Sequence, residues 1–324
     1  MPPAERLRQD RRIDDITTSP LTVTHHSAVT EDQIDHLGHM NVRFYGVNAH
    51  TGTAAILDVL GVDRADTQVV DAYTRHRREQ LLGAPLVVRS GVLDVGPFDL
   101  RLYHELANED TGDLAATFVH RVRREDGTGA DLPLPADTAA RAADLMTTVP
   151  AHGESRSIPL ASDPLATAPA IAALRDRELA MRKVRAVSAE ECAPDGAYVR
   201  TMAPMLVWGG APVDREQPEM LHTTDDGRRM GWASMETRLA IRRLPRAGDR
   251  IQSFSAVLAL ADKTSHRILW AYDVDDEELL VSFEIVNLAF DIEARSPMTI
   301  PDNIRGHETR VLHPELAPRV PSGA

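Results

Sequence analysis

A short segment, Asp35–Asn41, holds side chains whose types and spacing could do chemistry. It reads Asp-His-Leu-Gly-His-Met-Asn and stands directly before a pattern typical of a long helix. The first turn of a helix leaves backbone N–H groups unpaired and partially positive. Such groups could stabilise the oxyanion that forms when a thioester carbonyl is attacked. An upstream carboxylate, Asp35, could then attack that carbonyl or activate water.

The same segment also fits two other interpretations. Asp35 could be a turn or cap residue and Gly38 a left-handed position, which would make the segment purely structural. Two histidines beside an aspartate also suggest a metal. However, Asp35, His36 and His39 form no recognisable zinc frame, and Cys192 has no cysteine or histidine at ligand spacing. We therefore expect no metal site.

Length and charge exclude several classes of protein. The chain has 324 residues, which corresponds to about two domains. Its net charge of −13 argues against a general nucleic-acid binder, because such proteins need a basic face. No apolar run approaches the ~20 residues of a membrane-spanning helix, and Met1–Asp15 lacks the apolar core of a signal peptide. A single cysteine cannot form an internal disulfide. We expect a cytoplasmic protein that binds neither nucleic acid nor membranes.

The residues around the Asp35–Asn41 segment predict a strand, a long helix and then several antiparallel strands. Thr22–Val29 is β-branched and fits the first strand. Val42–Leu60 spreads apolar residues over about five turns and ends before Gly61, a helix C-cap. Its small residues would let other backbone approach closely, as when a sheet wraps a helix. The further predicted strands are Val69–Gln80, Leu86–Val95, Leu100–Ala107 and Leu114–Val122.

The second half repeats this pattern. Gly83–Phe118 and Gly248–Phe283 overlay at a constant offset of 165 residues. The order of elements repeats as well, with a strand-like Lys183–Ala189 and a helix predicted over Tyr198–Gly210. Four more strands are predicted at Ser234–Leu244, Arg250–Leu260, Arg267–Asp273 and Leu279–Asp291. Two copies of one unit, each a strand, a helix and a meander, explain this repeated order better than two unrelated domains. The alternative is that two β-meanders overlay by chance.

The spacing Asp35-x-x-Gly38-His39-x-Asn41-x-x-x-Tyr45 resembles a known signature. It is similar to Asp-x-x-Gly-His-x-Asn-Asn-x-x-Tyr of the 4-hydroxybenzoyl-CoA-type thioesterases, which have the hot-dog fold. The resemblance implies an α+β protein of two tandem hot-dog units that form a pseudo-dimer. In each unit an antiparallel sheet would wrap a long central helix, as in some acyl-CoA and acyl-carrier-protein thioesterases.

The expected organisation follows from this resemblance and from composition. The catalytic motif falls in the first hot-dog domain, and the second is matched only in pattern. Between them lies a connector rich in proline and alanine with short helices. The parts are a flexible arm at 1–20, domains at 21–129 and 183–300, the connector at 130–182 and a tail at 301–324.

The resemblance implies a catalytic role for three residues of the motif. Asp35 would be the catalytic carboxylate, as nucleophile or general base. His39 and Asn41 would orient the loop, the water or the carbonyl.

Three further residues are expected on the substrate side. The backbone N–H of Val42 would donate to the oxyanion, although the family usually has asparagine at this position. Gly38 belongs to the same loop, and Glu79 is a candidate second carboxylate, with a plain surface residue as its alternative. A basic cluster could meet CoA phosphates or be solvated surface: Arg75, Arg77 and Arg78.

The second half lacks the motif. Its corresponding turn, Glu190–Gly196, has no Gly-His-x-Asn, and Asp195 stands at a different spacing from the next helix. We expect one working site and one degenerate site. Three apolar side chains of the predicted second helix could face an acyl group or the core, and the core is favoured: Met202, Met205 and Trp208.

The function implied is hydrolysis of an acyl thioester, with acyl-CoA as the expected substrate and an acyl-carrier protein as the alternative carrier. No cofactor is implied, and the double unit could form homo-oligomers. Two other functions stay open. One is a non-catalytic acyl-CoA-binding hot-dog protein, since the second half has lost the motif. The other is a hot-dog dehydratase or hydratase, which uses a differently spaced aspartate and histidine pair.

Overall fold

The chain forms two compact units in the computed structural model, which describes residues 21–126, 129–213, 221–224 and 226–320. Of the described residues, 21–69 and 74–154 belong to the first unit, and 70–73 and those from 155 to 320 belong to the second. The arm expected at 1–20 and the last four residues of the expected tail lie outside the described residues.

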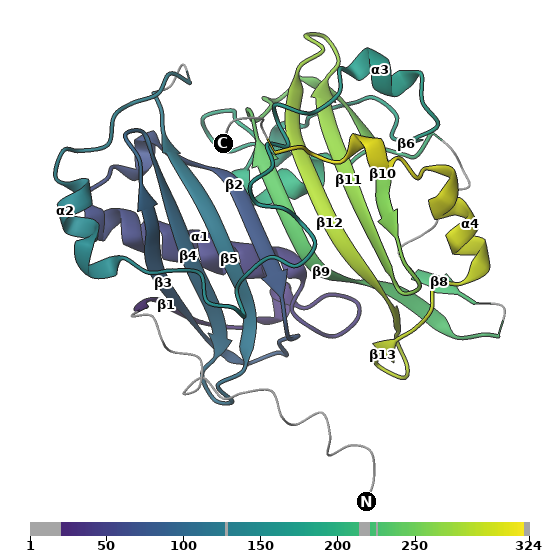
Figure 1. Cartoon of the computed structure of the whole chain (residues 1–324), viewed down its shortest axis with the longest axis horizontal. Helices are drawn as coiled ribbons and strands as arrows, with labels where there is room; N and C mark the ends of the chain where they lie inside the picture. The colour runs from purple at the N-terminus through teal and green to yellow at the C-terminus, as the bar shows by residue number, and fades with distance from the viewer. Residues whose placement is uncertain (1–20, 127–128, 214–220, 225, 321–324) are drawn as a thin grey trace, which may run out of the picture. The chain divides into compact units, whose positions relative to one another are not determined.

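The first unit combines one long helix with an antiparallel sheet in the order β1-β3-β4-β5-β2 (Figure 1). All five predicted strands form, and their ends differ from the predicted ones by a few residues. Their bounds are β1 (Thr22–Ala28), β2 (Thr67–His76), β3 (Pro85–Val95), β4 (Asp99–Asn108) and β5 (Leu114–Arg124).

The long helix α1 spans Val42–Leu60, as predicted. Its N-cap is Asn41, whose side chain accepts the N–H of Arg43, and it ends at Gly61 with a left-handed φ of 68°. The helix packs on β1, β3 and β4. A Cβ added at Gly52 would lie 2.8 Å from Val88 of β3, so the helix approaches the sheet too closely for a larger residue.

A polar network fills part of the space between α1 and the sheet. The hydroxyl of Thr53 lies 3.1 Å from His104 Nε2 and 2.9 Å from His120 Nδ1, and Ser90 Oγ lies 2.7 Å from His104 Nδ1. All four side chains are buried. Burial, together with the neighbouring His50, lowers the pKa of His104 to about 3. Burial also holds the pKa of His120 well below its ordinary value, so both rings are neutral.

The second unit has the strand order β9-β12-β11-β10-β6. Short strands extend it, because β8 pairs with β9, β13 with β12 and β7 with β10. The strand predicted over Lys183–Ala189 is limited to the two residues of β7. The bounds are β6 (Ala180–Met181), β7 (Arg185–Ala186), β8 (Leu221–Thr223), β9 (Arg229–Ile241), β10 (Arg250–Leu260), β11 (Thr264–Asp273), β12 (Leu279–Asp291) and β13 (Ser296–Pro297).

The long helix predicted over Tyr198–Gly210 is wrong. This segment forms a seven-residue 3₁₀ helix, η7 (Arg200–Leu206), with Pro204 inside it. Proline lacks an N–H and its ring clashes with the preceding turn, so an α-helix cannot run through this position. A long central helix is therefore present in the first unit, but not among the described residues of the second. Two of the three side chains proposed for core or acyl group, Met202 and Trp208, pack on the core, and Met205 is exposed.

The predicted offset of 165 residues recurs in the strands. β3 and β4 begin and end 165 positions before β10 and β11. The irregularities recur too, since the β3–β4 register shifts between Val92 and Asp94 and the β10–β11 register shifts between Val257 and Ala259. A β-bulge re-aims a strand locally, so its recurrence means that the two sheets bend at the same place.

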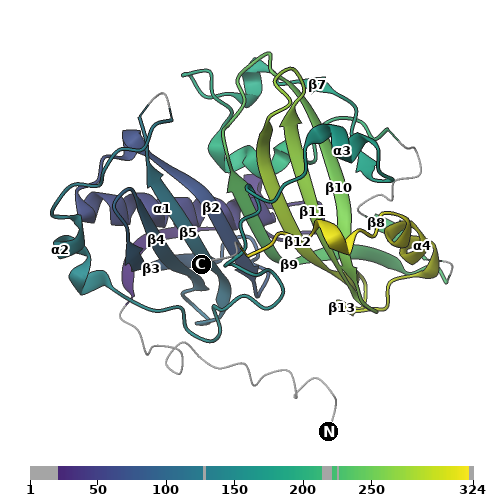
Figure 2. The ribbon, with the colours of Figure 1, turned by 45° about the horizontal axis from the view of Figure 1, so that its top comes forward.

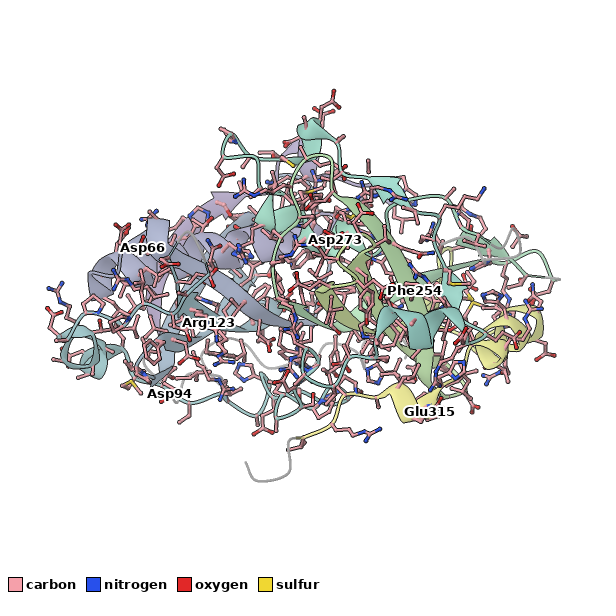
Figure 3. All side chains as sticks on the ribbon, turned by 90° about the horizontal axis from the view of Figure 1, so that it is seen from above. Asp66, Asp94, Arg123, Phe254, Asp273 and Glu315 are labelled. Atoms are coloured by element: carbon pink, nitrogen blue, oxygen red, sulfur yellow. The ribbon has the colours of Figure 1, made fainter. Side chains whose placement is uncertain are left out.

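The segment expected as a connector is divided between the units at Glu154. Its first part contains α2 (Thr138–Ala142), and its second part contains α3 (Ile171–Arg175), which lies against β10 and β11 (Figure 2). Ile171 of α3 is in the same buried cluster as Phe254 of β10, which Figure 3 labels.

Part of the expected tail is a helix, α4 (Asp302–Arg310), whose Ile304 is buried in an apolar cluster. The remaining short helices are η3 (Glu31–Gln33), η4 (Arg64–Asp66), η5 (Ala143–Leu145), η6 (Ala189–Glu191) and η8 (Pro314–Leu316). Within the described part of the chain, every helix is too short or too polar to cross a membrane.

Candidate active site

Backbone hydrogen bonds close the loop that precedes α1. The N–H of Asp35 donates to the carbonyl of His39 at 2.9 Å, and the N–H of Gly38 donates back to the carbonyl of Asp35 at 3.0 Å. The N–H of Asn41 donates to Gln33 at 2.9 Å. Gly38 has a φ of 83°, a conformation in which a Cβ is strained. The loop therefore holds Asp35 and His39 in a defined relation to the start of α1.

The loop and the end of β2 bring together three of the predicted site residues. Asp35 Oδ1 accepts the N–H of Leu37 at 2.9 Å, and Oδ2 lies 3.4 Å from His39 Nδ1. On the other side of the ring, His39 Nε2 lies 3.5 Å from Glu79 Oε1. The side chains of Asp35 and His39 are each 15% exposed and that of Glu79 is 42% exposed. The imidazole thus stands between an inner and an outer carboxylate.

The position of Glu79 is set by hydrogen bonds on both sides of it. The carbonyl of Arg78 accepts the hydroxyl of Tyr45 at 3.0 Å, and the carbonyl of Gln80 accepts the N–H of Met40 at 2.8 Å. Tyr45 is buried, and burial raises its pKa to about 12, so it remains a donor. The segment after β2 is therefore attached to both the loop and α1.

The other predicted site residues lie at the start of α1. Asn41 Oδ1 accepts the N–H of Arg43 at 3.1 Å, so its side chain acts as the helix cap. Val42 is the first residue of the helix, where backbone N–H groups lack intrahelical partners. Val42 itself is exposed.

The predicted basic cluster is not a single site. Arg75 is buried and donates to the carbonyls of His152 at 3.0 Å and Glu154 at 2.7 Å. It therefore holds residues of the connector. Arg78 is exposed and lies 3.5 Å from Asp113.

The second unit contains the same loop conformation at an offset of 158 residues. The N–H of Ala193 donates to Ala197 at 2.8 Å, and the N–H of Gly196 donates back to Ala193 at 2.8 Å. The N–H of Val199 donates to Glu191 at 3.0 Å, and Gly196 has a φ of 82°. These are the bonds and the left-handed glycine of the first loop.

The chemistry of the first loop is missing from this copy. Ala193 stands at the place of Asp35, and Ala197 at the place of His39. Val199 replaces Asn41 and gives no side-chain cap. Asp195 takes the place of Leu37, so it does not substitute for Asp35.

Sequence reasoning missed two features of the site. The repeated loop conformation in the second unit does have a sequence signal, because each loop follows a capping box, Thr30 with Gln33 and Ser188 with Glu191. The contact between His39 and Glu79 has none, since it depends on the pairing of Met40 with Gln80.

One family model matches part of the chain. Residues 29–142 match the family model described as the Thioesterase-like superfamily, a segment that contains the loop, α1 and β2 to β5. The resemblance to hot-dog thioesterases is confirmed. This thioesterase-like segment includes every predicted site residue. No curated protein sequence matches the chain.

Solved structures of hot-dog thioesterases share the fold. A protein described as a putative oleoyl thioesterase from Lactobacillus plantarum superposes with a TM-score of 0.59 and 11% identity, over 84% of this chain and 97% of that chain. The 12:0-ACP thioesterase from Umbellularia californica gives 0.58 and 9%, over 82% and 93%. An acyl-ACP thioesterase from Bacteroides thetaiotaomicron gives 0.56 and 8%, over 86% and 100%. At these identities the likeness concerns the fold alone.

Proposed function

We propose that this protein hydrolyses acyl thioesters, with acyl-CoA as the substrate and Asp35 as the catalytic carboxylate. The observation that carries the proposal is the placement of Asp35 in the thioesterase-like segment. Its Oδ1 is anchored on the N–H of Leu37, and its loop ends at the first turn of α1. A fixed carboxylate on a loop that leads into a helix N-terminus suits attack on a thioester carbonyl.

The reaction follows from these two groups. As a general base, Asp35 takes a proton from water on Oδ2 while the water oxygen attacks the thioester carbon. The N–H of Val42 at the start of α1 stabilises the oxyanion. The C–S bond then breaks and the electron pair leaves with the thiolate. As a nucleophile, Asp35 would instead form an anhydride that water opens.

CoA is proposed as the carrier because the motif resembles that of the 4-hydroxybenzoyl-CoA-type thioesterases. Arg43 on the first turn of α1 and Arg78 beside Glu79 are both exposed, but they lie on the segments that would hold the thioester end of the substrate. Since CoA carries its phosphates at the other end, these arginines do not distinguish CoA from an acyl-carrier protein.

We also propose that the chain is a tandem of two hot-dog units, 21–129 and 183–300, with one working site. Support comes from the 165-residue offset of strands and bulges and from the repeated loop. Since the second loop has alanine at the positions of Asp35 and His39, only the first half is expected to hydrolyse substrate.

The test measures thiol release from a panel of acyl-CoAs and acyl-carrier proteins. Asp35→Asn is expected to lower kcat by about 10²- to 10⁴-fold, the usual contribution of a positioned acid or base. Asp195→Asn is the matched control on the second loop and should leave kcat unchanged. Full activity in Asp35→Asn would disprove the assignment. Substrate binding in calorimetry without thiol release by the wild type would favour a non-catalytic binding protein instead.

A single turnover in ¹⁸O-water tests Asp35 as a nucleophile. Label in the carboxylate of Asp35 would indicate an anhydride that water opens at the aspartyl carbon. Label confined to the product acid fits a general base, and it also fits an anhydride that water opens at the acyl carbon.

A further inference from the structure

A continuous chain of hydrogen-bonding contacts joins α1 to the face of the sheet that it covers. At one end, Thr24 Oγ1 of β1 donates to the carbonyl of Val88 at 3.2 Å and lies 2.7 Å from Ser90 Oγ. Ser90 Oγ lies 2.7 Å from Nδ1 of His104, whose Nε2 lies 3.1 Å from Thr53 Oγ1. Thr53 is therefore the residue through which α1 joins the chain.

The direction of each hydrogen bond is fixed from the carbonyl end of the chain. A carbonyl only accepts, so the single hydroxyl hydrogen of Thr24 is used there, and that of Ser90 is used on Thr24. His104 must then donate from Nδ1 and accept on Nε2, where the hydroxyl of Thr53 donates. Thr53 Oγ1 also lies 2.9 Å from His120 Nδ1, so this second ring donates to Thr53. The neutral chain thus has one hydrogen for each of its five contacts.

We propose that this chain is an acid-sensitive latch, which holds α1 on the sheet near neutral pH and releases it when His104 and His120 take up protons. The candidate active-site loop leads directly into α1, so release of the helix would also release that loop. The inference goes beyond the proposed hydrolysis, because the latch depends on the buried face of α1 and not on the chemistry of the loop.

The chain has no place for an added proton. Each contact already holds a hydrogen, so a sixth hydrogen has no contact of its own. Burial lowers the pKa of both rings, and the groups that lower it further are histidines, His50 for both rings and His104 for His120. A histidine that has left the core titrates near its ordinary value of about 6.5. Acid therefore favours the state in which α1 has left the sheet.

The other ionisable side chains that face α1 bring no carboxylate to these rings. The helix itself has Arg43 on its first turn and Asp58 on its last, both exposed, and Asp58 pairs with Arg64 of η4. The remaining groups on elements packed against the helix are histidines and one arginine: His25 of β1, His76 of β2 and Arg141 of α2, which lies beside Gly61.

The second unit has the same strands without this chain. Ser255 stands 165 positions after Ser90, but the residue opposite it on the next strand is Leu269. Ser255 Oγ is buried and lacks a hydrogen-bond partner. The second ring is replaced by Ile285, which lies in the apolar core. The sheet thus forms without the histidines, and they are absent from the unit whose described residues form no long helix.

The first test reads the direction of the chain. Ring ¹⁵N chemical shifts at pH 7 should show His104 and His120 as neutral rings that each carry their hydrogen on Nδ1. A hydrogen on Nε2 of either neutral ring would contradict the chain and overturn the latch.

The second test reads the release of α1 by hydrogen exchange. Protection factors of the α1 amides, corrected for intrinsic exchange, should fall about 600-fold between pH 7 and pH 5, because each released histidine contributes about 25-fold. At pH 5 these amides should be less protected than those of β4, since the strands stay paired when the helix leaves. Protection in α1 that is unchanged at pH 5, or equal to that in β4, would overturn the latch.

A matched pair of variants tests the histidines themselves. His120→Asn removes one titrating ring and keeps an N–H donor near the position of Nδ1, so the fall should shrink to about 25-fold. His26→Asn changes a histidine of β1 whose side chain is 62% exposed and should keep the full fall. A full fall in His120→Asn would overturn the latch, and if this variant does not fold, the two wild-type measurements decide. None of these readouts uses thiol release, so the latch and the proposed hydrolysis can fail separately.

Discussion

The loop before α1 and the loop before η7 have the same backbone and different side chains. Each is closed by the same three hydrogen bonds and turns at a left-handed glycine, Gly38 or Gly196. Only the first carries Asp35 and His39, and only the first leads into a long helix. The difference shows that the loop is a scaffold that folds without its acidic and imidazole groups. The loop conformation therefore does not require Asp35 and His39, and we expect these two residues to serve catalysis.

The largest expected effect separates chemistry from folding in the first loop. Asp35→Ala makes this position identical to Ala193 of the second loop. We expect kcat to fall by about 10²- to 10⁴-fold. The midpoint of thermal unfolding should change little, because the second loop keeps its backbone bonds with alanine. Thiol release and a thermal melt of the same sample check this, and a large fall in the midpoint would mean that Asp35 is mainly structural.

The second prediction concerns the cores of the two units. His104 and His120 are buried and neutral, with pKa values far below the ordinary 6.5, whereas the residues 165 positions later, Leu269 and Ile285, are apolar. In the unfolded chain these histidines take up protons below pH 6.5, while the native rings stay neutral until about pH 3 in the case of His104. The free energy of unfolding should therefore fall as pH drops below 6.5, by up to about 1.4 kcal/mol per pH unit for each histidine.

Hydrogen exchange at pH 7 and pH 5 measures this difference. Amides of α1 and β4 should lose protection at pH 5, and those of β11 should lose less. Equal loss in both units would contradict a role for the buried histidines.

A third comparison uses the two glycines. Gly38→Ala and Gly196→Ala each place a Cβ at a left-handed φ and should each cost about 1 kcal/mol of unfolding free energy or slightly more. Neither Cβ meets a close neighbour, so the strain is that of the backbone alone. Only Gly38→Ala should also lower kcat, because it shifts Asp35 and His39. Denaturant unfolding and thiol release distinguish the two variants, and equal kcat in both would separate the loop from catalysis.

The smallest expected effect concerns the residues that precede the helices. Asn41 caps α1, whereas Val199 stands at the same place without a side-chain cap. Asn41→Ala should lower the unfolding free energy by about 1 kcal/mol, and Val199→Asn should raise it by less than that. Urea unfolding of both variants checks the pair, and a stabilised Asn41→Ala variant would contradict the capping role.

Local signals account for the elements that could be predicted. α1 has its predicted bounds because Asn41 and Gly61 both act within one turn of its ends. β10 and β12 likewise match the predicted residues, since continuous apolar runs bounded by turns are typical of buried strands. The long helix predicted over Tyr198–Gly210 rests on apolar residues at helical spacing. It is wrong because Pro204 lies in the interior of this segment, where an α-helix does not tolerate proline.

The motif, the order of the main strands and the 165-residue repeat follow from the amino-acid sequence alone, because each depends on residues close together in the chain or on a regular spacing. Two facts come from the folded structure: Glu79 stands beside His39, and the second loop has the conformation of the first. The first fact requires a backbone bond between Met40 and Gln80, forty residues apart. The second depends on hydrogen bonds between backbone groups, and its trace in the sequence is limited to the capping box before each loop and the glycine within it.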